Sequence, residues 1–333
     1  MKKTLLMISL LISFGFSQKE YDINHIVEQD GVYIKKFSDE VVNGTVYQMV
    51  DDMKVPLGKM KKGKKEGIWT VWNNNGTKKE EQNFVDGAKN GINIFWYENG
   101  QKKSEINYKN GELDGLETGW YENGQKLVEQ TYKNGELDGL RTWWYENGKK
   151  RAESNYKDGK ADGLQTWWDE NGQKEKEQTS KDGKADGLVT IWHENGQKKS
   201  EATYKDGELD GVQTWWDENG QKTGEGIYKE GIKEGLWKNW YASGEIEEGV
   251  YKSGEEYGKW TKWYENGERE IIHYRNGIEN GLNIYWYKNG QKKYEGSYKT
   301  GRKDGSWTFW YENGKIKRER IFNFGRFVDE KNY

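Results

Sequence analysis

Tryptophan recurs along this chain at a nearly fixed interval, at the end of short runs in which apolar and polar residues alternate. The interval is 24 residues, except for two steps of 23 residues, from Trp240 to Trp263 and from Trp263 to Trp286. A constant period of this length indicates a tandem array in which every copy is one supersecondary unit. The eleven members of this row, called here the register tryptophans, are Trp72, Trp96, Trp120, Trp144, Trp168, Trp192, Trp216, Trp240, Trp263, Trp286 and Trp310.

Each copy also carries two kinds of glycine-containing turn. In the copy from Gly115 to Gly139, two alternating runs flank Glu122-Asn123-Gly124, a typical hairpin signal. A second turn at residues 133–139, expected to be the looser one, leads into the next copy. The pattern therefore predicts an all-β fold, an elongated antiparallel meander of tandem β-hairpin repeats of about 24 residues that forms a coiled single sheet.

The loop length decides which rows of side chains share a face of this sheet. A two-residue Asn-Gly loop would place each register tryptophan beside a row of glutamates such as Glu129. A three-residue Glu-Asn-Gly loop with a glycine bulge would place it beside a row of tyrosines such as Tyr132. Burying tryptophan with tyrosine costs less than burying a carboxylate. We therefore expect the three-residue loop, and the register tryptophans as the structural core.

The ends of the chain depart from the repeat. Residues 1–17 have the features of a secretory signal peptide, with two lysines, an apolar run over residues 4–16, and small residues before the cleavage site. Residues 18–43 form a lead segment, and 44–66 form a degenerate capping repeat with Met49 and Met60 in place of the aromatic residues. The eleven repeats occupy 67–328, and 329–333 form a tail. The basic residues of the strand at 315–320 would discourage edge-to-edge pairing.

Composition restricts the class of function. Of the residues, 33% are charged, but aromatic residues reach 15%, which is unusual for a disordered chain. The formal net charge of −3 does not favour nucleic acid as a partner. There is no cysteine, and the three histidines, His25, His193 and His273, fall in unrelated registers. With no recurrent catalytic set we expect no enzyme and no cofactor. Aspartates before glycine, such as Asp158 and Asp182, suit turns better than a metal site.

The repeat resembles a known family. The run Trp-Tyr-Glu-Asn-Gly at 144–148, followed by Glu153 and Tyr156, looks like the bacterial variant of the MORN repeat, and the resemblance covers about residues 63 to 328. It implies tandem β-hairpins. Proteins with this repeat are often labelled YwqK-type antitoxins, so the resemblance also implies a toxin–antitoxin role as one reading.

A second set of tryptophans fills only part of the array. Trp143, Trp167 and Trp215 directly precede register tryptophans and lie on the opposite face by parity, with Ile191 in the copy between them. In outer copies that face carries tryptophan two residues earlier, as at Trp237. We predict that Trp143, Trp167 and Trp215 form a binding stripe among lysine and glutamate side chains. The alternative is that they pack against the next coil of the sheet.

These observations predict an exported, periplasmic or extracellular, non-enzymatic repeat scaffold that binds a protein or a cell-envelope polymer. One alternative is an antitoxin or immunity protein that neutralises a toxin. Another is a glycan-binding surface protein, with tryptophan rings as stacking platforms. No integral membrane segment is expected after signal removal, because the apolar run over residues 4–16 is too short to span a bilayer. The sequence leaves the oligomeric state open.

Overall fold

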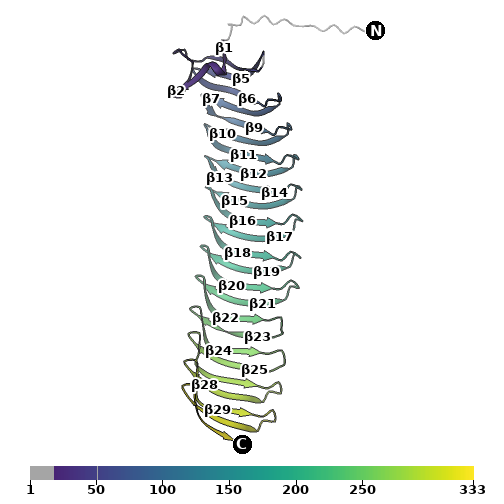
Figure 1. Cartoon of the computed structure of the whole chain (residues 1–333), viewed down its shortest axis with the longest axis vertical. Helices are drawn as coiled ribbons and strands as arrows, with labels where there is room; N and C mark the ends of the chain where they lie inside the picture. Colours follow the sequence, from purple (N-terminus) through teal and green to yellow (C-terminus); the bar gives the residue numbers. More distant parts are fainter. Residues whose placement is uncertain (1–18, 51) are drawn as a thin grey trace, which may run out of the picture. The chain divides into compact units, whose positions relative to one another are not determined.

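The computed structural model describes residues 19–50 and 52–333, so the predicted signal peptide, 1–17, lies outside the described residues. The chain divides into two compact units, and Figure 1 shows that each is built from hairpins that follow one another in chain order. Unit 1 runs to Gly139 and includes residues 146–148, and unit 2 comprises residues 140–145 and 149–333. The predicted fold class is confirmed, because nearly all pairings within the units are antiparallel and join consecutive strands.

Unit 1 contains the following elements: β1 (Glu20–Asp22), the 3-10 helix η1 (Ile23–His25), β2 (Ile26–Gln29), β3 (Val32–Lys35), β4 (Gly44–Val50), β5 (Met53–Lys61), β6 (Lys64–Trp72), β7 (Lys78–Val85), β8 (Ala88–Lys89), β9 (Gly91–Trp96), β10 (Lys102–Lys109), β11 (Glu112–Trp120), β12 (Lys126–Lys133) and β13 (Glu136–Leu137). Over residues 19–50 and 52–333, no helix is long and apolar enough to span a membrane.

Unit 2 continues the same alternation of strands. It contains β14 (Gly139–Trp144, from residue 140 on), β15 (Lys150–Lys157), β16 (Lys160–Trp168), β17 (Lys174–Lys181), β18 (Lys184–Trp192), β19 (Lys198–Lys205), β20 (Glu208–Trp216), β21 (Lys222–Lys229), β22 (Ile232–Trp240), β23 (Ile246–Lys252), β24 (Glu255–Trp263), β25 (Arg269–Arg275), β26 (Ile278–Glu279), β27 (Gly281–Trp286), β28 (Lys292–Lys299), β29 (Arg302–Trp310), β30 (Ile316–Asn323) and β31 (Arg326–Asn332).

The loop inside each hairpin has three residues, as predicted. In the copy around Trp120, the Tyr121 amide donates to the Gln125 carbonyl at 2.9 Å, and the Gly124 amide donates back to the Tyr121 carbonyl at 3.0 Å. Gly124 has a φ of 84°, which favours glycine, and the Asn123 side chain accepts a hydrogen bond from the Gln125 amide at 2.9 Å. The Glu-Asn-Gly sequence therefore specifies a turn followed by a glycine bulge.

The turn between copies is tighter than predicted. Lys133 and Glu136 are paired, so the loop consists of Asn134 and Gly135 alone. Both have positive φ, 50° and 85°, as a type I′ turn requires. The expectation of a looser second turn was wrong. The irregularity lies further on, at the glycine that opens the next copy, which also has a positive φ (116° at Gly139) and interrupts the ladder.

The predicted pairing of the register tryptophans with the tyrosine row was also wrong. Thr166 is opposite Glu177, Trp167 is opposite Lys176, and Trp168 is opposite Lys174, so Glu175 is an extra residue on β17. This second bulge, which follows two residues after the loop, moves Trp168 to the face of the glutamates. Lys174 and Glu177 then point to one face and form an ion pair at 2.6 Å, so the carboxylate is paired and not fully buried.

The two copies of 23 residues lack this second bulge. Trp240 is opposite Ile246, and Asn239 is opposite Glu247, with no shift in register. The three-residue loop persists, since the Tyr241 amide donates to the Glu245 carbonyl at 2.9 Å. The missing residue is therefore the extra residue of the strand, and the glycine bulge of the turn is kept.

The sheet consequently has two different faces in unit 2. The lysine–glutamate face carries the register tryptophans together with ion pairs such as Lys174–Glu177. The tyrosine face carries Tyr156, Tyr204, Tyr228, Tyr251, Tyr274 and Tyr298, and with them the buried Trp237, Trp260 and Trp307. Trp307 is only 1% exposed, whereas the register tryptophans are half-buried. The most deeply buried tryptophans are therefore Trp237, Trp260 and Trp307 on the tyrosine face, and not the register tryptophans, which lie on the opposite face.

The lead segment and the first hairpins of unit 1 share one apolar cluster. It comprises Tyr21, Ile26, Val42, Val46, Met60, Trp69 and Phe84. β1 pairs in parallel with β4, and the Tyr33 amide donates to the Gly63 carbonyl at 2.8 Å. The β4–β5 hairpin lies where the degenerate capping repeat was predicted, and Met60 is 3% exposed. The lead segment thus packs onto this end of unit 1 through Tyr21, Ile26 and Val42.

The C-terminal residues form a further strand where a tail was expected. β31 pairs with β30 from Asn323↔Arg326 to Arg318↔Asn332. The Phe322 and Phe327 rings lie 6.1 Å apart, and Arg320 forms an ion pair with Glu330. The pairing arises because the turn before β31, with Phe324 and Gly325 at positive φ, repeats the type I′ geometry of the other copies. The basic strand is therefore an inner strand.

Candidate binding face

The three tryptophans predicted to bind a partner lie on one face of unit 2. Trp167 and Trp215 are each the penultimate residue of a first strand, and their pairing places them on the tyrosine face. Arg141 stacks on both Trp143 and Tyr156, at 4.7 and 5.9 Å from the ring centroids, which places Trp143 on the same face. All three indoles are half-buried. We call Trp143, Trp167, Ile191 and Trp215 the aromatic stripe.

Small side chains flank Trp167 and Trp215 on some of the neighbouring strands. Trp167 is paired with Ala152 on the preceding strand. Trp215 is paired with Ser200 on one side and with Gly224 on the other. Because Ala152, Ser200 and Gly224 barely rise above the sheet, they leave those sides of the indole rings uncovered. On the other side of Trp167 the paired residue is Lys176, a long side chain.

Cations and a second aromatic ring hold the stripe in place. The Arg141 guanidinium lies 4.7 Å from the centre of the Trp143 ring, and the Lys176 ammonium lies 5.1 Å from that of Trp167. Trp215 packs against the buried Trp237, with their ring centroids 5.7 Å apart. Each contact restricts the rotamers of an indole, so the rings are preorganised.

The surroundings of the stripe differ from those predicted. The lysine and glutamate rows lie on the other face, because of the bulge at Glu175. On that face, a lysine of the preceding copy lies over the ring of a register tryptophan. The Lys150 ammonium lies 5.9 Å from the ring centroid of Trp168, and the Lys174 ammonium lies 5.5 Å from that of Trp192. These repeated contacts are those of a structural ladder.

Sequence reasoning missed an exposed aliphatic row on the lysine–glutamate face. Its members in unit 2 are Leu140, Leu164, Leu188, Val212 and Leu236, and they are between 47% and 57% exposed. The available signal was their place directly after the glycine that opens each copy. These residues share the parity of the register tryptophans and therefore lie on the same face of the sheet.

A hydrogen-bonded cluster near the last copies was also missed. Glu270 is 9% exposed and accepts hydrogen bonds from the Tyr264 and Tyr294 hydroxyls, both at 2.8 Å. Burial raises the pKa of both tyrosines, and the neighbouring Glu270 adds to the effect. One contact of the cluster recurs in the preceding copy of 23 residues, where the Tyr241 hydroxyl donates to Glu247 at 2.9 Å, so the tyrosine and glutamate at these repeat positions were the available signal.

Glu268 stands beside this cluster and stays ionised. Burial opposes its ionisation, but hydrogen bonds from Lys293, Asn266 and Tyr285 outweigh that effect and lower the pKa of Glu268. The Lys293 ammonium lies 2.9 Å from its carboxylate, and the Tyr285 hydroxyl lies at the same distance. All these polar groups satisfy one another, which identifies a structural network.

Two of the three histidines contact backbone carbonyls through their rings. His193 Nε2 lies 3.0 Å from the Trp216 carbonyl, and His273 Nδ1 lies 2.7 Å from the Leu282 carbonyl, while His25 lies in η1. In the part of the chain that the structure describes, no group of three or more acidic, histidine or cysteine side chains is placed to hold a metal ion.

The repeated turn chemistry and the two-faced sheet define a tandem β-hairpin repeat protein. The family model of the MORN repeat variant matches ten segments, and the chain belongs to this family. The segments are residues 65–86, 89–110, 113–134, 137–158, 161–182, 185–206, 209–230, 233–253, 279–300 and 303–323. A search among curated proteins found no match.

The family model does not match the copy between residues 253 and 279. The hairpin of this copy, β24–β25, has the same loop as the others. The Tyr264 amide donates to the Glu268 carbonyl, and the Gly267 amide donates to the Tyr264 carbonyl, both at 2.9 Å. This copy is therefore a hairpin like its neighbours.

Proposed function

We propose that this chain is an exported, non-enzymatic repeat scaffold that binds a protein or a cell-envelope polymer through the aromatic stripe of unit 2. Export rests on the features of residues 1–17. The absence of an enzymatic role rests on the chemistry of the side chains, since two of the three histidines are engaged with backbone carbonyls.

The observation that carries the proposal is the position of Trp143, Trp167 and Trp215. They occupy equivalent places on one face, and each is half-buried. The same place holds Asn239 and Lys262 in later copies, so hairpin formation does not require an aromatic residue there. Rigid, half-exposed aromatic side chains grouped on one surface are typical of binding sites.

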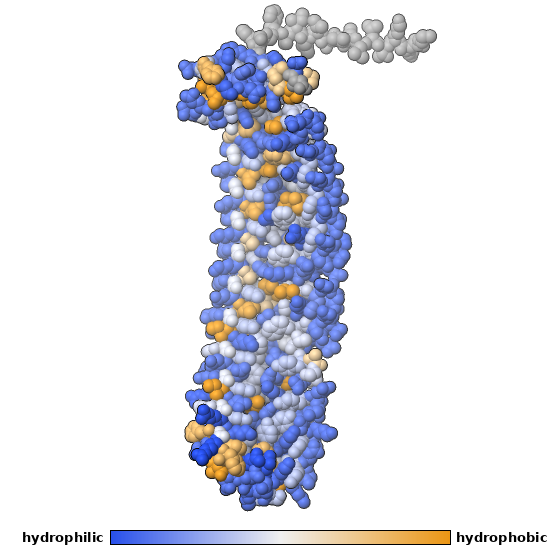
Figure 2. All heavy atoms as spheres, in the orientation of Figure 1, coloured by the Kyte–Doolittle hydropathy of each residue, from blue (hydrophilic) through white to orange (hydrophobic). Residues whose placement is uncertain are grey.

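On the face drawn in Figure 2, pale and apolar residues lie between edges of charged ones. Charged residues at the rim and aromatic residues at the centre are the usual composition of a protein-binding patch. An antitoxin role would be the special case in which the bound protein is a toxin.

The test is the triple substitution of Trp143, Trp167 and Trp215 to Thr, which keeps strand propensity and removes the aromatic area. The mature chain, immobilised, should capture its partner from an extract of its own cell envelope, and the triple variant should lose that capture. The control replaces Leu140, Leu164 and Leu188, which are exposed on the other face, with Thr. Capture lost equally by both variants, or by neither, would refute the stripe as the binding surface. Thermal unfolding of each variant shows whether the fold survives.

A further inference from the structure

Ile191 is the one member of the aromatic stripe that is not aromatic, and a hollow opens beside it at the edge of unit 2. Its volume is about 510 Å³, and it lies between the loop at residues 169–175 and the strand end at 191–194. Ile191 is 37% exposed and contributes, together with Trp192, the apolar part of the wall. In the copies on both sides, the corresponding residue is Trp167 or Trp215.

The pairing fixes how far the hollow is from the two indoles. Ile191 is opposite Lys176 on one side and Ser200 on the other. Lys176 is opposite Trp167, and Ser200 is opposite Trp215. Each tryptophan is thus two strands from Ile191, roughly 9.6 Å along the sheet. The wall of the hollow stands midway between two preorganised aromatic rings.

The loop beside the hollow is held rigidly. The Asn171 and Gln173 amides both donate to the Asp169 carboxylate, at 2.9 and 2.8 Å. The Lys149 ammonium donates to the Asn171 carbonyl at 2.9 Å. His193 is anchored through Nε2 to the Trp216 carbonyl, which directs its ring. A ligand would therefore meet a preformed surface.

Two carboxylates on the wall remain free to bind. Glu175 and Glu194 line the hollow, and within the described residues neither accepts a hydrogen bond. Glu175 is the extra residue of the second bulge, so the bulge itself turns it out of the ladder. With Asp169 and Glu170 nearby and Lys174 as a counter-charge, the lining is acidic. An anionic ligand is disfavoured, and hydroxyl groups are well matched as donors.

We propose that this hollow binds one sugar of an uncharged, β-1,4-linked glycan chain, in which the sugars two units away on either side stack on Trp167 and Trp215. In such a chain the same ring face recurs once per disaccharide, a spacing comparable to that between equivalent residues of successive copies. The apolar ring faces meet Ile191 and the indoles, while the hydroxyl groups donate to Glu175 and Glu194. This inference rests on the proposed function, because it assigns a ligand to the same stripe.

The decisive variant is Ile191→Trp. Tryptophan is already accommodated at this place in the neighbouring copies, so the variant should fold, and its indole would occupy the hollow. Titration of the mature chain with hexa-N-acetylchitohexaose, followed by calorimetry, should show binding that Ile191→Trp weakens by roughly tenfold or more. Leu188→Trp, on an exposed residue of the opposite face, is the matched control and should leave the affinity unchanged.

A second measurement uses the double variant Glu175→Gln and Glu194→Gln, titrated with the same glycan. It should fold normally, because both side chains are exposed. This double variant should weaken binding by roughly several-fold, as expected for lost charge-assisted hydrogen bonds.

Tighter or unchanged binding by Ile191→Trp would overturn the hollow as the site, since a continuous aromatic track would then suffice. Binding of polygalacturonate in preference to chitohexaose would overturn the uncharged ligand. If neither glycan binds while the envelope partner is still captured through the stripe, the glycan inference fails and the proposed function stands.

Discussion

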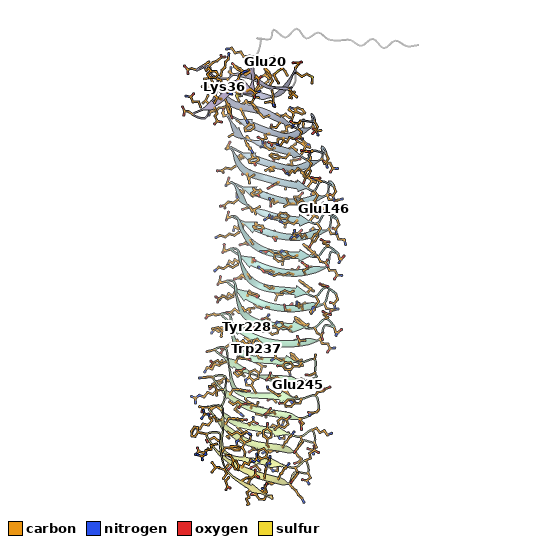
Figure 3. The ribbon with its side chains drawn as sticks, viewed as in Figure 1. Glu20, Lys36, Glu146, Tyr228, Trp237 and Glu245 are labelled. Atoms are coloured by element: carbon orange, nitrogen blue, oxygen red, sulfur yellow. The ribbon has the colours of Figure 1, made fainter. Side chains whose placement is uncertain are left out.

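Trp237 lies flat against the backbone of Gly226, its partner on the neighbouring strand β21, so that a Cβ added to Gly226 would lie 2.3 Å from the indole ring. Figure 3 shows Trp237 on the sheet close to Tyr228, and their rings meet edge to face at 5.2 Å. The same relationship joins Gly296 to Trp307, where the added Cβ would lie 2.1 Å from the ring. A buried tryptophan thus depends on a glycine in the second strand of the preceding copy.

The first prediction follows from this close approach. Gly226→Ala should destabilise unit 2 by about 1–3 kcal/mol, because the added methyl group forces the indole of Trp237 out of its place. The free energy of unfolding in urea measures the loss. In a Trp237→Val background the same substitution should be nearly neutral, since the equivalent pair two strands earlier joins Ala202 to Gln213, with no tryptophan above the alanine. An equal loss in both backgrounds would show that the indole is not the cause.

The second prediction compares the two tryptophan rows. Trp237 is 4% exposed, so Trp237→Ala should cost about 3–5 kcal/mol. Trp168 is half-buried on the opposite face, and Trp168→Ala should cost roughly half as much or less. Amide hydrogen exchange should show the loosening in nearby hairpins, with distant ones protected. A larger loss for Trp168 than for Trp237 would contradict the observed assignment of the two faces.

The third prediction concerns the ion pairs that cross the second bulge. Lys174→Met removes the pair with Glu177 and the contact with Trp192, at 5.5 Å from its ring centroid. Both groups are partly exposed, so the cost should be no more than roughly 1–2 kcal/mol, and smaller at high salt. Lys181→Met, at the next turn, is a control expected to change stability very little. A cost that is the same at low and high salt would show that packing, and not charge, is responsible.

The fourth prediction is a loss of stability in alkali. Burial raises the pKa of Tyr251 and of Tyr274 to about 12 in the folded chain, above the usual value of about 10 in an unfolded one. Between these values the unfolded chain has released protons that the folded chain still holds. The stability present below pH 10 should therefore be lost as the pH rises towards 12.

The measurement is urea unfolding at a series of alkaline pH values, together with tyrosinate absorbance of the folded chain. Tyr274→Phe should reduce the slope of stability against pH, because one of the groups that hold their protons is removed. Tyr311→Phe, at an exposed tyrosine, is the control and should leave the slope unchanged. Normal titration of all tyrosines in the folded chain would refute the argument.

The sequence alone determined the repeat, the hairpins and the length of the loop inside each hairpin. Local chemistry is sufficient for these features, because Glu122-Asn123-Gly124 needs only its own backbone and one asparagine side chain to form its turn. The candidate binding residues Trp143, Trp167 and Trp215 could be picked out for the same reason, since strand parity separates them from the register row. β31 was missed because its residues lack the repeat pattern, although its turn keeps the common geometry.

Only the tertiary structure decided which rows lie together. A one-residue bulge reverses every side chain beyond it, and the bulge at Glu175 carries no signal of its own among charged neighbours. The contacts that the reversal creates set its position: Lys174 reaches Glu177 on the same strand and Trp192 of the next copy, and the buried tryptophans meet the tyrosines on the other face. The hollow at Ile191 likewise depends on two loops separated by a full copy of the repeat. Such features arise from packing between copies, which no single copy of the sequence contains.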